Sequence, residues 1–67
     1  MTPQVLQRVK RELDGSHVPI AAMDLWNRLR LPREVVYEAL VHLHDREQAH
    51  IRPRTDTNGH RFDWEAA

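Results

Sequence analysis

The chain has 67 residues, which suits a single small domain over residues 1–67 and leaves too little sequence for a second. Ten basic residues balance ten acidic ones and cysteine is absent, so the composition excludes a globally basic nucleic-acid binder, a disulfide framework and thiolate chemistry. The sequence opens without a signal-peptide layout, and no apolar run approaches the roughly 20 residues of a membrane span. We therefore expect a cytoplasmic protein with no membrane contact.

The first predicted helix covers residues 3–14. Thr2 is placed to cap it and Pro3 to fill its first helical position. Apolar residues recur at helical spacing on one stripe, which is Val5, Leu6, Val9 and Leu13. Gly15 is expected to end the helix in the left-handed conformation, and residues 17–19 are expected to form a short extended link.

Two more helices are predicted, over residues 20–29 and 32–46. The break at Leu31-Pro32 separates them, because proline disfavours helical geometry in the residue before it but suits the first turn of a new helix. The second helix carries the apolar residues Ala22, Leu25, Trp26 and Leu29. The core stripe of the third helix is Val36, Ala39, Leu40 and Leu43.

Beyond Glu47 the apolar period changes from 3.6 to 2, which predicts a two-stranded hairpin over about residues 48–65. Asn58-Gly59 supplies the strongest turn signal between the two strands. Large side chains are expected to close the hairpin over the helices, namely Trp26, Phe62 and Trp64, with Ile51 also facing inward. The alternation then places arginines on the outward face, namely Arg52, Arg54 and Arg61.

The order of helix, short extended segment, helix, three-residue break, helix and hairpin resembles the winged helix-turn-helix superfamily of bacterial regulators, from about Val5 to Trp64. Apolar residues match the turn of that family and its third helix, namely Leu25, Leu29, Leu31, Val36, Leu40 and Leu43. The resemblance implies a mainly α fold with a small β-hairpin wing (α+β), in which helix three presents its outer face to the major groove. The family commonly has glycine near Arg30 and near Glu47, where this chain departs from it.

DNA binding by a small transcriptional or mobile-element regulator is the first functional prediction. Arginines gather before the third helix and along the wing, and the guanidinium fork matches phosphate oxygens. The residues predicted to contact double-stranded DNA are Arg28, Arg30, Arg33, Tyr37, Arg52, Arg54 and Arg61.

A protein–protein interaction module is the alternative prediction, because the outer face of the third helix is acidic. The residues of that face are Glu34, Glu38, Val41 and Asp45. Carboxylates beside phosphates oppose the counterion release that provides most non-specific DNA affinity. A lone domain also covers too little of the groove for tight specific binding, so either function implies a protein partner or a homodimer.

Enzymatic activity, metal binding and cofactors are not predicted. His42 and His44 point about 200° apart on a helix, and no histidine pair has the i, i+4 spacing of a helical metal site. Ser16 adjoins His17 but has no third partner for nucleophilic catalysis in view, so its expected role is to end the first helix.

Overall fold

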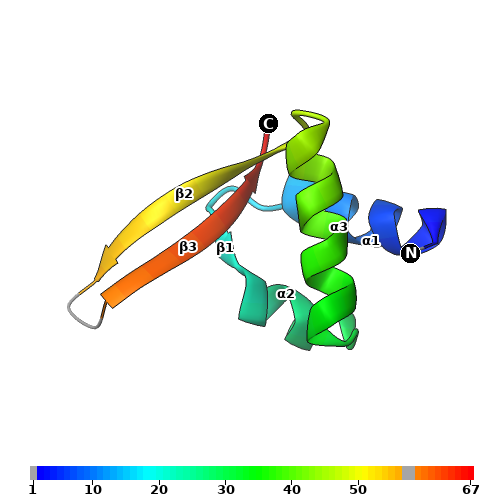
Figure 1. Ribbon diagram of the computed structural model, residues 1–67, viewed down its shortest axis with the longest axis horizontal. Helices are drawn as coiled ribbons and strands as arrows, with labels where there is room; N and C mark the ends of the chain where they lie inside the picture. The colour runs from blue at the N-terminus through cyan, green and yellow to red at the C-terminus, as the bar shows by residue number, and fades with distance from the viewer. Residues whose placement is uncertain (1, 57–58) are drawn as a thin grey trace.

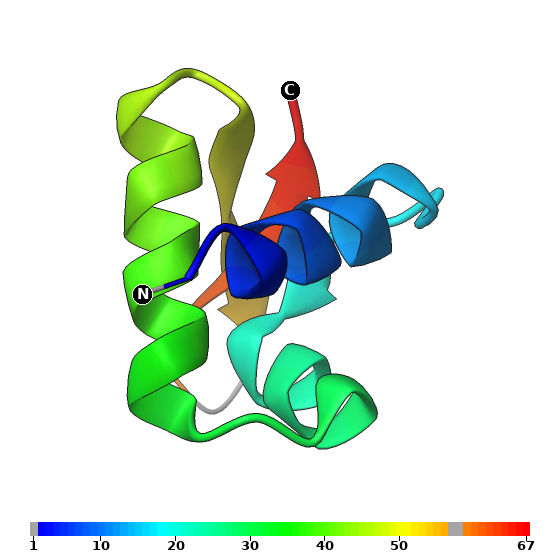
Figure 2. The ribbon, with the colours of Figure 1, turned by 90° about the vertical axis from the view of Figure 1, so that its right-hand side faces the viewer.

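The computed structural model describes residues 2–56 and 59–67, with the backbone alone at residues 54–56 and 59–61. The described elements follow in the order α1 (Pro3–Asp14), β1 (Ile20–Ala21), α2 (Ala22–Leu29), α3 (Arg33–Asp45), β2 (Ala49–Asp56) and β3 (Gly59–Ala66). The hairpin of β2 and β3, here called the wing, projects from the helices (Figure 1). Figure 2 shows α1 lying across the helical end of the molecule, with α3 beside it and α2 below. The predicted α+β class with three helices and a hairpin is confirmed.

The first helix begins as predicted and ends differently. Thr2 accepts a hydrogen bond from the backbone N–H of Val5 at 3.3 Å, and Pro3 opens the helix. The prediction of a left-handed Gly15 is wrong, because its φ is −81°. Its N–H donates to the carbonyl of Arg11 at 3.0 Å, which continues the right-handed turn by one residue. The chain leaves the helix at Ser16, whose hydroxyl donates to the carbonyl of Val18 at 2.6 Å.

The second helix begins at Ala22, so the prediction that it begins at residue 20 is wrong. Ile20 and Ala21 instead form β1, which pairs antiparallel with β3 in the register Ile20↔Trp64 and Ala21↔Asp63. The strand order is β1-β3-β2, and β3 is therefore the central strand of the sheet. Ile20 is buried in this conformation, so burial of its side chain and pairing of its backbone both favour the strand.

The turn between α2 and α3 is built on a left-handed arginine. Arg30 has φ 54° and ψ 44°, and its N–H and that of Leu31 both donate to the carbonyl of Trp26. Glycine suits this backbone conformation best, and an arginine adopts it here. Pro32 precedes α3, which covers residues 33–45 where residues 32–46 were expected.

The same geometry recurs where α3 ends. Glu47 has φ 60°, its N–H donates to the carbonyl of His44 at 3.0 Å, and the N–H of Gln48 donates to that of Leu43 at 2.8 Å. This pair of bonds is a Schellman motif, which satisfies the last helical carbonyls and turns the chain into β2. Arg30 and Glu47 therefore both adopt the left-handed conformation without being glycine.

The hydrophobic core lies where the three helices meet the base of the sheet. It contains Val9, Leu13, Ile20, Ala22, Leu25, Val36, Ala39, Leu40, Leu43, Ala49 and Trp64, which confirms the predicted stripe of α3. The wing pairs from Ala49↔Ala66 to Asp56↔Gly59, and the predicted turn residue Asn58 lies outside the described residues. Phe62 is 57% exposed, so its predicted place in an aromatic cluster is wrong. It pairs with Pro53, further along the wing than the Ile51↔Trp64 pair at the core.

Candidate interaction surface

The outer face of α3 is exposed along its whole length. Glu34, Glu38 and Asp45 are solvent-exposed acids, and Val41 between them is 51% exposed. The burial of the opposite stripe fixes the rotation of the helix, so these side chains cannot turn away without opening the core. The residues predicted for the alternative protein interface therefore lie together on one surface.

Tyr37 borders this surface on the side of α2. It is 43% exposed, and its ring lies 5.7 Å from that of the half-buried Trp26 at a tilt of 55°. A tilted ring pair at this distance is a favourable aromatic contact. The Tyr37 ring is therefore held in place while much of it remains available to a partner.

The wing turns its apolar face toward α3. Trp64 is buried on that face, and its ring meets the ring of His44 of α3 edge-on at 6.2 Å. Ile51 is its cross-strand partner and Phe62 is two residues away on the same strand, so all three side chains share one side of the hairpin. Ile51 is 38% exposed and Phe62 57% exposed, which leaves apolar surface beyond the core.

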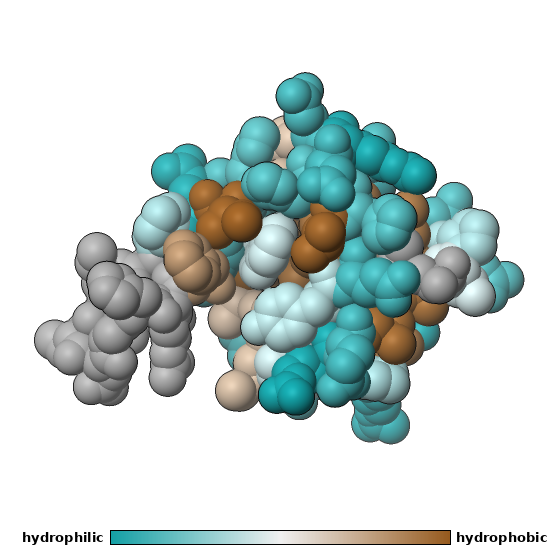
Figure 3. Space-filling model, in the orientation of Figure 1, coloured by the Kyte–Doolittle hydropathy of each residue, from teal (hydrophilic) through white to brown (hydrophobic). Residues whose placement is uncertain are grey.

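These two surfaces adjoin and are here called the α3–wing face. Figure 3 shows apolar side chains over the wing and α3 on one side of the molecule, with hydrophilic side chains around them. The exposed members of the face are Glu34, Tyr37, Glu38, Val41 and Asp45 of α3 and Ile51 and Phe62 of the wing. Ile51 and Phe62 were predicted to face inward and are exposed instead, because alternation shows which residues share a strand face and not how far the core extends.

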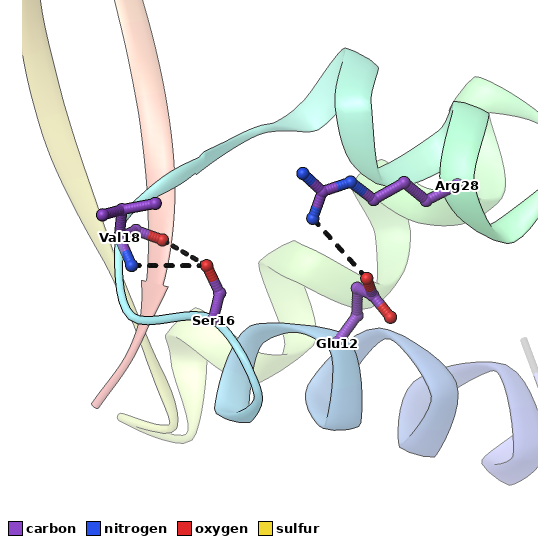
Figure 4. A network of polar contacts seen from close by, with 4 residues as sticks. All are labelled: Glu12, Ser16, Val18 and Arg28. Carbon is purple, nitrogen blue, oxygen red and sulfur yellow. Dashed lines mark hydrogen bonds and ion pairs between the residues drawn. The ribbon is translucent and has the colours of Figure 1, made fainter.

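The arginines predicted to contact DNA have different surroundings. Arg28 points toward α1, where its guanidinium lies 3.6 Å from a carboxylate oxygen of Glu12 (Figure 4). Arg30 is exposed in the left-handed turn. Arg33 is exposed and lies 3.7 Å from Glu34, its neighbour in sequence. Surface pairs of this kind contribute little stability and break easily, so they leave both side chains able to reach a ligand.

On the wing, Arg52 lies on the side opposite Ile51. It donates to a carboxylate oxygen of Glu65 at 2.7 Å, across the strands, and most of its side chain is exposed. Arg54 and Arg61 are cross-strand partners by backbone register, and their predicted side-chain contacts lie outside the described residues. The structure therefore separates the wing into an apolar side and a side that carries Arg52.

Within the described ranges, no group of three histidine, aspartate or glutamate side chains is placed to hold a metal ion. Among the helices of the same ranges, none combines the length and the apolar character that a bilayer crossing requires. No protein-family model matches the chain, and no curated protein matches it.

Proposed function

We propose that this chain is a winged-helix protein-association domain that binds its partner through the α3–wing face, within the cytoplasm. The observation that supports this most is the exposure of apolar side chains from two separate elements on one acidic surface. Aromatic and aliphatic residues at the centre of a patch with polar residues around it are typical of protein interfaces. Tyr37 and Val41 of α3 and Phe62 of the wing are exposed, and the α3 residues lie among the acids Glu34, Glu38 and Asp45.

The charge of α3 opposes the role that DNA binding would give this helix. A recognition helix in the major groove, which is about 12 Å wide, brings its outer side chains within about one Debye length of phosphates at physiological salt. Glu34, Glu38 and Asp45 would then meet phosphates with little screening. One glutamate can accept a hydrogen bond from cytosine, but three carboxylates reduce the electrostatic affinity that DNA binding requires.

DNA binding by a small transcriptional or mobile-element regulator remains the second candidate function. The specific observation in its favour is the exposure of Arg30 and Arg33 beside the first turn of α3, together with that of Arg52 on the wing. Those positions flank the helix that this fold would place in the groove. The DNA site would then comprise Arg28, Arg30, Arg33, Tyr37, Arg52, Arg54 and Arg61.

Titration with a mixed-sequence DNA duplex at two salt concentrations separates the two candidates. We expect the native protein to bind no tighter than the non-specific range of about 10⁻⁴–10⁻⁶ M at physiological salt. Replacing Arg30 and Arg33 by alanine should then change little. Nanomolar binding that weakens in the arginine variant and tightens when Glu34 and Glu38 become glutamine would overturn the proposal, because both effects require α3 beside phosphates.

Affinity capture with matched variants tests the association itself. Val41→Ser removes an apolar side chain from the α3–wing face, whereas Val18→Ser makes the same change at an exposed position in the link after α1. We expect a specific partner to be retained by native protein and by Val18→Ser and to be lost from Val41→Ser. Equal retention by all three proteins would show that the bound material does not use this face.

A further inference from the structure

We infer that the partner segment of the α3–wing face is a basic amphipathic helix from another protein. This inference rests on the proposed function and specifies the chemistry of the partner. Two observations support it. One is the line of carboxylates on α3, and the other is the pair of adjoining apolar surfaces on α3 and on the wing.

The carboxylates define the length and sign of the partner surface. Glu34 and Asp45 are eleven residues apart, which is about 16 Å along a helix axis, and Glu38 lies between them. Arg33 lies 3.7 Å from Glu34 and offsets part of the charge at one end. Glu34 and Asp45, at the two ends of this line, complement lysine or arginine side chains about three helical turns apart.

The apolar residues define the shape of the partner. Tyr37 and Val41 are four residues apart on α3 and therefore lie one above the other on the same side of the helix. Ile51 and Phe62 extend the apolar surface onto the wing. A helix with one apolar stripe can contact both surfaces at once and still direct basic side chains from its flanks toward α3, as amphipathic helices do in other recognition surfaces.

A second copy of this chain fits the surface poorly. In a two-fold antiparallel contact between two α3 helices, Glu34 of one copy would lie opposite Asp45 of the other at both ends of the interface. Glu38 would lie near the centre of the same contact. Like charges across an interface are unfavourable, so the charge pattern of α3 selects a basic partner rather than itself.

Two synthetic 14-residue peptides probe the inference directly. One has leucine at helical stripe spacing with lysine elsewhere, and the other has the same leucines with glutamate in place of lysine. We expect fluorescence anisotropy to detect binding of the lysine peptide at micromolar concentration and none of the glutamate peptide. Amide chemical-shift changes should concentrate in α3 and around Ile51 and Phe62 of the wing.

Charge variants of equal net change locate the contact. Glu34→Gln with Asp45→Asn should weaken lysine-peptide binding about fivefold, as expected for two lost surface ion pairs. Asp14→Asn with Asp24→Asn makes the same change in net charge on α1 and α2 and should leave the affinity within about twofold. Circular dichroism melting of each variant shows that the fold is retained.

Several outcomes would overturn the inference. They can be told apart from failure of the proposed function, which the capture comparison tests separately. Equal weakening by both charge variants would mean that the peptide responds to net charge and not to α3. Tight binding of the glutamate peptide that is lost in Val41→Ser would keep the face as a docking surface and reject a basic partner. A native dimer in sedimentation that dissociates in Val41→Ser would identify a second copy as the occupant. If neither peptide binds, the inference is wrong while the capture comparison still decides the proposed function.

Discussion

Replacing Glu47 by glycine should stabilise the protein, although glycine in the interior of a helix is usually destabilising. Glu47 has φ 60°, where an L-residue other than glycine is disfavoured by about 1–2 kcal/mol. Glycine is free of that cost but loses about 0.5–1 kcal/mol through its greater freedom in the unfolded chain. The net gain is therefore about 0.75 kcal/mol, or a rise in Tm of about 3–6 °C for a domain of this size.

The neighbouring position provides the matched control. Arg46 has φ −92°, so Arg46→Gly relieves no strain and should lower the free energy of unfolding by about 0.5–1 kcal/mol. Glu47→Gln removes the negative charge near the C-terminus of α3 and keeps the side chain, so it measures the helix-dipole contribution alone. Urea unfolding followed by circular dichroism compares the four proteins. If Glu47→Gly is no more stable than Glu47→Gln, the left-handed conformation carries no cost and the reasoning is refuted.

Five further substitutions, at four positions, test the packing and the cap of α1. Leu40→Ala should reduce the free energy of unfolding by about 2–5 kcal/mol in a urea titration, because Leu40 is fully buried in the core, and an unchanged midpoint would contradict the packing of α3. Thr2→Ala should cost about 1 kcal/mol through loss of the cap on α1, whereas Thr2→Ser should retain most of it. Phe62→Ser should change stability by less than about 0.5 kcal/mol, whereas Trp64→Ala should cost about 3–5 kcal/mol. Equal losses for these two variants would show that Phe62 is packed.

The three helices were predictable because their signals are local. Thr2 and Pro3 mark the start of α1, and the buried stripe of α3 follows from spacing alone. The strand β1 was not predictable in the same way. Ile20 is apolar at a position that suits either a helix or a strand, and its strand partner Trp64 is far away in the sequence. Pairing between distant segments overrode a local preference there.

The candidate site was predictable in part. The acidic face of α3 follows from the same periodicity that identifies its core, whereas the exposure of Phe62 depends on the size of the wing. A strand of eight residues spans about 26 Å and α3 only about 20 Å, so the distal part of the wing extends past the helices. The carboxylate that each arginine meets also depends on tertiary placement, as with Arg28 and Glu12 on different helices.

The two candidate functions depend on residues that differ in how freely they can be reoriented. Arg28, Arg33 and Arg52 are held by surface pairs that cost little to break, so their present orientations decide little about what they bind. The carboxylates of α3 have no comparable freedom, because Val36, Ala39, Leu40 and Leu43 are fully buried on the opposite side of the helix. Turning the acids away would expose those residues at a cost that approaches the stability of a small domain. The fixed acidic and apolar surface of α3 is therefore stronger evidence for the partner than the adaptable arginines, and it favours a basic protein over DNA.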